Sequence, residues 1–357
     1  MPYFPLYLAE LGFDGWQIGV LIGMQPALRW GGAIWWAYVA DRWRIRHRLL
    51  LATSLGGTLL FVPMLWLQDF TAVLATLGLV SLLHGGLIPM LDATVMDHLS
   101  RLGGDYGRLR LWGSLAFVVG ALVSAPLMGW FSPRIVPLLV LVPMIAMVPA
   151  FARLPREQVG HGERFLAPWT LLTRPLTAFL VTAFLIQLSC GAWGAFFSLH
   201  TTALGFSTAV PGITWGLAVS AEVAMLFWGR TIVEHFRPAQ LIIIALVATV
   251  FRWSLTAVAR NEMLVIGLQL GHAFTFSAFH LAALILLSRL VPPQSSTGGQ
   301  ALYGLVAFGI GGSSGLLLAG ALVQPLGTAG LFGFEAVIAL AGLVPAAWLW
   351  KLTRTRA

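Results

Sequence analysis

Apolar stretches of about twenty residues follow one another along almost the whole of this chain. A helix needs about 20 mostly apolar residues to cross a bilayer, and only helices or closed barrels satisfy the backbone there. We expect spanning helices near residues 16–40, 49–67, 71–98, 110–130, 135–152, 175–200, 209–230, 239–259, 263–288, 298–323 and 328–350. Residues 2–13 resemble the second half of one more, so helix 1 is expected to be incomplete. The sequence therefore predicts an all-α, polytopic membrane protein.

The composition excludes a soluble protein and gives no sign of an enzyme. Only 10% of the residues are charged, against about 25% in an ordinary soluble domain, and 58% are hydrophobic. We find no nucleotide-binding motif, no nucleophile–base pair and no Cys/His cluster with metal spacing. The single cysteine, Cys190, lies inside an apolar span and cannot form an intramolecular disulfide. We therefore expect no enzyme activity, no metal and no organic cofactor.

The net charge of +8 is explained by the positions of the basic residues rather than by a nucleic-acid partner. Alternate loops, which would share one side of the membrane, carry Arg42, Arg44, Arg46, Arg48, Arg101, Arg108, Arg153, Arg156, Arg164, Arg174, Arg230, Arg237, Arg289, Lys351, Arg354 and Arg356. The opposite side has only Arg134 and Arg260. Because basic loops stay in the cytoplasm, the carboxyl terminus is expected to be cytoplasmic, in a bacterial inner membrane.

One long polar stretch, residues 153–174, divides the chain into two parts. The expected organisation is an N-terminal bundle of six helices over 1–152, a cytoplasmic linker over 153–174 and a C-terminal bundle of six helices over 175–357. Two such halves around a linker resemble the major facilitator transporters, whose halves rock about a site near the middle of the membrane. We expect a functional monomer whose partners are the lipid bilayer and a small-molecule substrate.

The segment between the second and third spans supports that resemblance. Ala37-Tyr-Val-Ala-Asp41-Arg42, followed by three more arginines, is similar to the major facilitator signature G-x-x-x-D-R-x-x-R-R. Ala37 occupies the position of the first glycine, so the match is partial. The resemblance implies a conformational role for Asp41 and Arg42. A simple run of cytoplasmic positive charge is the alternative.

Ionisable residues inside the apolar spans are the strongest functional signal, because a charge in hydrocarbon is costly unless it has a partner or faces water. These residues are Arg29, Asp92, Arg110, Glu222, Arg252 and His272. Asp92 and Arg110 lie near the same end of two consecutive, antiparallel spans, so they can meet. Such a pair would leave the arginine a donor for a solute. An ion pair that only fixes the intervening loop is the alternative.

Three further ionisable residues occupy consecutive spans of the C-terminal half. At 1.5 Å per residue, Glu222, Arg252 and His272 lie roughly 20, 11 and 14 Å from the outer ends of their helices. An acid, a permanent cation and a histidine that titrates near neutrality at one level can handle a proton. A neutralised structural triad is the alternative.

The helix-five region carries a more specific resemblance. The stretch DYGRLRLWGSLAFVVG, residues 105–120, resembles the matching motif of the 3-phenylpropionic acid transporter family and of its lactose permease relatives. The resemblance implies that Arg110 is the main substrate contact, that Asp92 is its partner, and that Phe117 stacks on a substrate ring. Phenylpropionate-type proteins also carry an arginine in the region of Arg29, which would suit an anionic solute. Alternatively, Arg29 only neutralises Asp92.

The same resemblance extends over HAFTFSAFHLAA and QALYGLVAFGIGGS in the C-terminal half. It implies roles in substrate coordination and proton coupling for Glu222, Arg252 and His272. The chain departs from the pattern at Thr275, where lactose permease has its proton-carrying glutamate. Coupling would then use Glu222, His272 or His280, or be absent. His280 lies on about the same helical face as His272, and packing is its alternative role.

Taken together, the sequence predicts proton-coupled uptake of a small organic solute by alternating access. An aromatic carboxylate such as phenylpropionate is favoured, and a sugar or nucleoside stays open. The alternatives are efflux of drugs or metabolites by the same fold, or a transport-inactive membrane sensor. His84 and His200 are expected to serve packing. Glu335, near the outer end of the last span, is expected to be interfacial.

Overall fold

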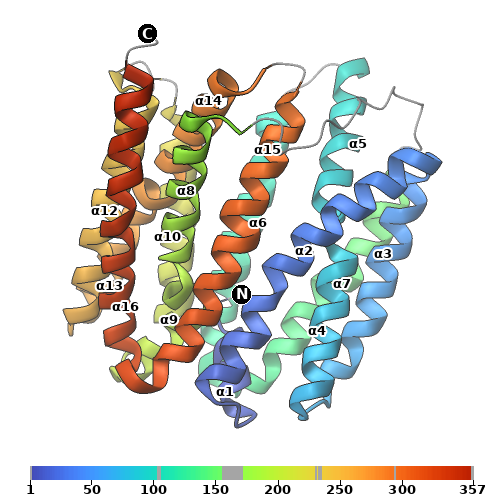
Figure 1. Cartoon of the computed structure of the whole chain (residues 1–357). Coiled ribbons are helices and arrows are strands. Elements are labelled where there is room, and N and C mark those ends of the chain that lie inside the picture. Colours follow the sequence, from blue (N-terminus) through green and yellow to red (C-terminus); the bar gives the residue numbers. More distant parts are fainter. Residues whose placement is uncertain are drawn as a thin grey trace.

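The computed structural model describes residues 2–102, 106–154, 172–229, 231, 235–292 and 295–354. At positions 41, 97, 100–102, 106–108, 110, 296 and 297 it describes the backbone but not the side chain. The described residues form helices that run side by side, and they contain no strand (Figure 1). This arrangement confirms the predicted all-α fold.

The part of the chain before residue 154 contains long helices joined by short turns. In chain order they are α1 (Phe4–Glu10), α2 (Gly15–Trp43), α3 (Arg46–Phe61), η1 (Val62–Leu65), α4 (Phe70–His84), α5 (Leu87–Leu102), α6 (Tyr106–Trp130), η2 (Pro133–Ile135) and α7 (Val136–Ala152). Asp14 begins α2 as a capping box, because its carboxylate accepts the N–H of Gln17 while the Gln17 amide accepts the N–H of Asp14.

The part after residue 172 contains more interrupted helices. They are α8 (Arg174–Leu188), α9 (Gly191–Ala203), α10 (Val210–Phe227), α12 (Pro238–Val258), α13 (Glu262–Leu268), η4 (Gln269–Gly271), η5 (Ala273–Ala278), α14 (Phe279–Leu290), α15 (Ser296–Gly304), η7 (Leu305–Gly311) and α16 (Gly312–Thr353). Both η5 and η7 are π-helical turns. Such turns often mark functional sites within α-helices.

The observed helices lie within a few residues of the predicted spans, but several spans are divided or joined differently. Predicted span 71–98 is two helices, α4 and α5, with Gly85 and Gly86 between them. The last two predicted spans are joined in α16, which bends at Gly327, where φ is +65°. Asp41 and Arg42 belong to the last turn of α2 rather than to a loop, because the chain turns only at Arg44, with φ 54°.

Nine helical stretches in the described part are long and apolar enough to cross a membrane. One of them, Gly298–Thr353, contains both of the last two predicted spans. The protein is therefore a multi-pass membrane protein.

The helices from the two parts of the chain touch where small residues let their backbones approach. Helix α2 lies against the first part of α16 (Figure 1), and a Cβ added to Gly19 would lie 2.6 Å from the Cα of Gly320. Helix α6 meets α10, and a Cβ on Gly212 would lie 2.6 Å from the carbonyl oxygen of Ala121. Tyr3 adds a bridge, since its hydroxyl accepts the Gly212 N–H at 2.9 Å.

Candidate functional site

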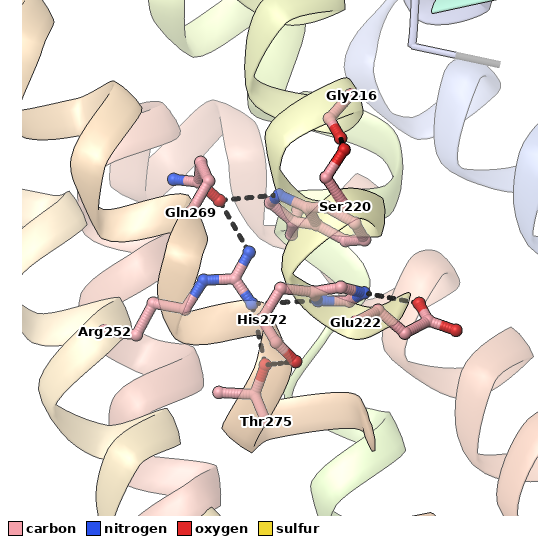
Figure 2. A network of polar contacts seen from close by, with 8 residues as sticks. Gly216, Ser220, Glu222, Arg252, Gln269, His272 and Thr275 are labelled. Atoms are coloured by element: carbon pink, nitrogen blue, oxygen red, sulfur yellow. Dashed lines mark hydrogen bonds and ion pairs between the residues drawn. The ribbon is translucent and has the colours of Figure 1, made fainter. Parts of the chain in front are cut away.

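A buried polar network centres on Arg252 of α12 (Figure 2). Only 3% of Arg252 is exposed. Its Nη1 donates to Thr275 Oγ1 at 2.8 Å and to His272 Nδ1 at 3.2 Å, and its Nη2 donates to Gln269 Oε1 at 2.6 Å. The three acceptors lie on η4, η5 and the residue between them, where the helix departs from regular α geometry. The irregular turns thus place three acceptors on one guanidinium.

The bond from Arg252 fixes the tautomer of His272. A guanidinium nitrogen is only a donor, so His272 Nδ1 must be the acceptor and the ring proton must be on Nε2. Nε2 lies 3.7 Å from Oε2 of Glu222 on α10, and Figure 2 shows the two side chains pointing toward each other. A second proton on His272 would place two donors face to face at Arg252. The Arg252–His272 bond therefore requires a neutral imidazole.

Aromatic faces complete the surroundings of the Arg252 cation. The guanidinium carbon lies 5.1 Å from the ring centroid of Trp193 and 4.3 Å from that of Trp253, both within cation–π range. Trp193 also donates its indole N–H to Gln269 Oε1 at 3.2 Å. Among the described residues, no carboxylate lies within ion-pair distance of Arg252. Its hydrogen-bond partners are neutral dipoles, and aromatic rings cover its faces.

A row of rings extends from this network across the molecule. Trp215 of α10 stacks on Trp193 of α9 at 3.9 Å, and Trp193 stacks on His272 at 4.8 Å. His272 stacks on Phe276 at 5.4 Å, and Phe276 stacks on His280 at 5.8 Å, both with interplanar angles of 11°. The π-helical turn η5 brings residues four apart into line. The row is thus continuous from α10 to α14.

Residues of the N-terminal half touch this row in two places. Phe117 of α6 packs on Trp215 with ring centroids 6.0 Å apart. Trp30 of α2 stacks on Phe308 of η7 at 6.3 Å, and Phe308 lies 6.2 Å from Phe276. The row therefore runs along the boundary between the two halves of the chain.

His280 lies at the far end of the row and has its own partner. Its Nδ1 is 3.1 Å from the hydroxyl of Tyr303, and the two rings stack at 5.9 Å. The structure joins His280 to His272 through Phe276 rather than by direct contact.

Arg29 and Asp92, the described ionisable residues predicted for the site in the N-terminal half, do not form a hydrogen-bonded network like that of Arg252. Arg29 is exposed, and it interacts electrostatically with His84 of α4. Asp92 of α5 is half-buried. Among the described residues, neither Arg29 nor Asp92 makes an ion pair or a side-chain hydrogen bond. The side chains of Arg110 and Asp41 lie outside the described part, so the predicted Asp92–Arg110 pair stays a prediction.

A cavity of about 500 Å³ opens between α6 and α10. Its lining residues are Leu111, Trp112, Ser114, Leu115, Val118, Ser220 and Val223. They come from both halves of the chain, and the two on α10, Ser220 and Val223, lie close to Glu222 in the sequence. Its volume lies within the range of about 300–1,000 Å³ that is typical of small-molecule sites.

Two residues of this region were not predicted from the sequence, and the role of a third was predicted differently. Gln269 and Trp193 were not singled out, although Gln269 is a polar residue in an apolar span and Trp193 lies far from a span end. The interfacial prediction for Glu335 is wrong, since only 3% of it is exposed. The bend at Gly327 starts the last helical segment, and Glu335 lies about two turns inside it. His200 is buried and bonds to Thr328, which agrees with packing.

Comparisons with known proteins agree with this architecture. The chain is 28% identical to the probable 3-phenylpropionic acid transporter of Escherichia coli K12, covering 95% of the chain and 90% of that protein. It is 25% identical to a maltose permease of Geobacillus stearothermophilus, with 99% and 91% covered. A crystal structure of a mutant nucleoside transporter NupG matches with a TM-score of 0.88 at 14% identity, covering 98% of this chain and 95% of that one, which shows a common fold.

The family model described as the MFS_1 like family matches residues 1–334, which is most of the chain. The relatives and the structural neighbour are transporters, not enzymes. The chain therefore belongs to the MFS_1 like family and is a major facilitator transporter of small solutes.

Proposed function

We propose that this protein imports an aromatic carboxylate, such as 3-phenylpropionate, together with protons across a bacterial inner membrane. One observation carries the proposal: a row of stacked rings follows the boundary between the halves, and Trp30, the neighbour of the exposed Arg29, reaches it through Phe308. Rings receive a planar apolar body, and a guanidinium binds a carboxylate through a bidentate fork. The similarity to a probable 3-phenylpropionic acid transporter supports the same substrate class.

In this proposal the N-terminal half recognises the solute. Arg110 binds the carboxylate and Asp92 orients Arg110. Arg29 supplies a second cation, and its lack of a bond to any described residue supports that role, because its donors stay available. Phe117 is about one-third exposed beside Trp215, which supports stacking on the solute. Sugars and nucleosides also stack on rings, so the substrate must be tested against them.

The C-terminal half couples transport to protons through Glu222, His272 and Arg252, with His280 at the end of the row. A proton added to His272 conflicts with the Arg252 donor. A proton added to Glu222 removes the negative charge that faces His272, while the neutral carboxyl can still accept the Nε2–H through its carbonyl oxygen. A proton on His272 therefore breaks the Arg252–His272 bond, which is 3.2 Å long in the present state, and the charge of Glu222 controls how readily His272 takes that proton.

This change would bias which side of the membrane the site opens to. A proton moving down the membrane potential releases about 2.3 kcal/mol per 100 mV. That energy supports roughly fortyfold accumulation of solute per proton, because about 1.4 kcal/mol corresponds to a factor of ten. The basic loops and the carboxyl terminus would face the cytoplasm, with Asp41 and Arg42 ending α2 on that side. The carrier would act as a monomer and need only the proton as coupling ion.

The decisive experiment is uptake of labelled phenylpropionate, lactose and uridine into proteoliposomes with and without an inward pH gradient. We expect accumulation of phenylpropionate, stimulated by the gradient. Accumulation of lactose or uridine instead would contradict the substrate. Movement only out of the cytoplasmic side would indicate efflux, and binding without flux would indicate a sensor.

Substitution of Arg110 tests the recognition site. Arg110→Lys keeps the charge but loses the planar fork, so we expect uptake to be abolished while the amount of protein in the membrane stays normal. Arg108→Lys, two residues away, is the matched control and should transport normally. Undiminished uptake by Arg110→Lys would remove Arg110 from the site.

A further inference from the structure

A buried carboxylate on the last helical segment takes no part in the proposed function. Glu335 lies in the part of α16 that follows the bend at Gly327, and only 3% of it is exposed. Its Oε1 accepts a hydrogen bond from the backbone N–H of Ala192, the second residue of α9. Its Oε2 has no hydrogen-bond partner among the described residues. A carboxylate buried with one oxygen bare is costly and calls for an explanation.

Glu335 meets α9 where the spanning helix is broken. Helix α8 ends at Leu188 and α9 begins at Gly191, so the two are separate segments of one predicted span. Cys190 is the N-cap of α9, but its side chain does not cap the helix, because the thiol is bonded to the Ile186 carbonyl at 3.3 Å. The first N–H groups of a helix need an acceptor from elsewhere. Glu335 supplies it from a distant part of the chain.

Few charged or titratable side chains lie near Glu335 on the elements that pack around it. Arg252 of α12 and Cys190 interact with it electrostatically. From α9 the titratable side chain is His200, two turns farther along, where it bonds to Thr328 at 2.9 Å. Helix α8 carries only Arg174, at its opposite end.

Two opposing effects act on the charge of Glu335. The N-terminal end of α9, with its positive dipole, and the Arg252 cation favour the ionised form. Burial and the bare Oε2 favour the protonated form, because desolvation disfavours a charge. Neither form satisfies every polar group of the site.

The first turn of α9 leads directly into the polar network. Ala192 is followed by Trp193, whose indole donates to Gln269 at 3.2 Å and stacks on His272 at 4.8 Å. Trp193 also stacks on Trp215 at 3.9 Å. A shift of the first turn of α9 therefore moves a ring that contacts the network around Arg252.

We propose that Glu335 is a second proton-binding site, which holds the first turn of α9 when it is ionised and releases it when it is protonated. Release lets α8 and α9 realign at their break and moves Trp193 against His272. The effect on transport rests on the proposed proton coupling. The binding of a proton at Glu335 does not depend on the identity of the solute.

Infrared difference spectra of the purified protein, recorded against pH without any solute, test proton binding directly. We expect a protonated-carboxyl band that disappears in Glu335→Gln. The glutamine oxygen can still accept the Ala192 N–H, so this variant should fold, and Glu335→Asp should keep a titrating band. Glu262→Gln is the matched control, since Glu262 accepts the Ser207 N–H at 3.2 Å at an exposed position. A Glu335→Gln spectrum identical to that of the unmodified protein overturns the proposal.

Cys190, the single cysteine of the chain, reports on the helix break. At alkaline pH we expect a membrane-permeant thiol reagent to label Glu335→Gln several times faster than the unmodified protein, because the neutral side chain binds α9 more weakly. At acidic pH the two rates should converge. Equal rates at every pH would mean that the charge of Glu335 does not control the break, and would overturn the proposed release.

Transport assays separate this inference from the proposed function. We expect Glu335→Gln to exchange solute between equal concentrations while its dependence on pH is flattened. If the unmodified protein shows no uptake driven by a pH gradient but the infrared band still depends on Glu335, the coupling mechanism fails and the proton site stands. If uptake is driven by the gradient and Glu335→Gln keeps the same pH profile, the inference about Glu335 fails and the coupling mechanism stands.

Discussion

In the C-terminal half Arg252 is almost fully buried and both terminal nitrogens of its guanidinium donate to side chains. In the N-terminal half Arg29 is exposed and makes no hydrogen bond with a described residue. A guanidinium whose two terminal nitrogens are both engaged responds to changes in its own partners, whereas one with free terminal nitrogens can bind a group that arrives from outside. The comparison supports a division of work in which the N-terminal half recognises the solute and the C-terminal half senses protons.

The largest effect is expected from Arg252→Lys, which changes the buried, hydrogen-bonded guanidinium of the C-terminal half. An ammonium cannot span the acceptors on Thr275, His272 and Gln269, so we expect at least two interhelical bonds to be lost. At about 0.6–1.7 kcal/mol each, the loss of two bonds corresponds to roughly a sevenfold to several-hundredfold fall in transport rate. Initial rates in proteoliposomes and thermal unfolding in detergent measure the change.

Arg260→Lys is the control for that prediction. Arg260 follows the end of the same helix, is exposed, and within the described part of the chain hydrogen-bonds to the nearby carbonyls of Ala257 and Ala259. We expect normal rates and stability. A similar loss in both variants would mean that any arginine near α12 matters, and the special role of the network would be lost.

The second-largest effect is expected from a change at Glu222, the carboxylate proposed to take part in proton coupling. Glu222→Gln removes the carboxylate that faces His272 at 3.7 Å but keeps a side chain of the same shape. We expect steady-state accumulation, up to about fortyfold per proton at 100 mV, to fall toward equality across the membrane. Exchange of solute between equal concentrations should persist and lose its dependence on pH. Accumulation that still follows the pH gradient would remove Glu222 from coupling.

The sequence alone predicts the helices well and the network only in part. Spanning segments follow from the length of apolar stretches, which the bilayer sets directly, so α10 (Val210–Phe227) and α12 (Pro238–Val258) lie close to where hydropathy places them. Similar depth also places Glu222, Arg252 and His272 near one another. Depth says nothing about rotation around a helix axis, however. The π-helical turn η5, which aligns His272 with Phe276, has no signature in composition.

Glu335 illustrates what hydropathy cannot show. Its position near the end of a span is compatible with the interface, and only the break between α8 and α9 makes it a buried partner of Ala192. The two bonded residues are more than 140 positions apart in the chain, so no local pattern reveals their contact. Gln269 is similar, because its part in the network depends on where the guanidinium of Arg252 lies.

A smaller effect is expected on the recognition side. Arg29→Gln removes the exposed cation of α2, and a hydrogen bond to a charged group contributes about 1.5–3 kcal/mol. We expect the affinity for phenylpropionate to weaken by about tenfold or more, with little change in the maximal rate. Concentration dependence of initial uptake separates the two quantities. Arg48→Gln, at an exposed position in α3, is the control.

The response of Arg29→Gln to pH sharpens the comparison. If recognition and coupling are divided between the halves, this variant should keep the same accumulation ratio at saturating solute. A lower accumulation ratio with unchanged affinity for the solute would mean that Arg29 takes part in proton coupling. Arg29 and Arg252 would then not have separate roles.

The smallest effect is expected at a contact between the N-terminal and C-terminal halves. Phe117 is the residue of α6 that packs on Trp215, at 6.0 Å between ring centroids. Phe117→Leu keeps an apolar contact but removes a ring, and an aromatic pair contributes about 0.5–1.5 kcal/mol beyond its buried area. We expect affinity for phenylpropionate to fall by a few fold, and affinity for a carboxylate of similar size without a ring to stay unchanged. An equal loss for both solutes would show that Phe117 only packs the halves together, because stacking on the solute distinguishes a ring from a chain.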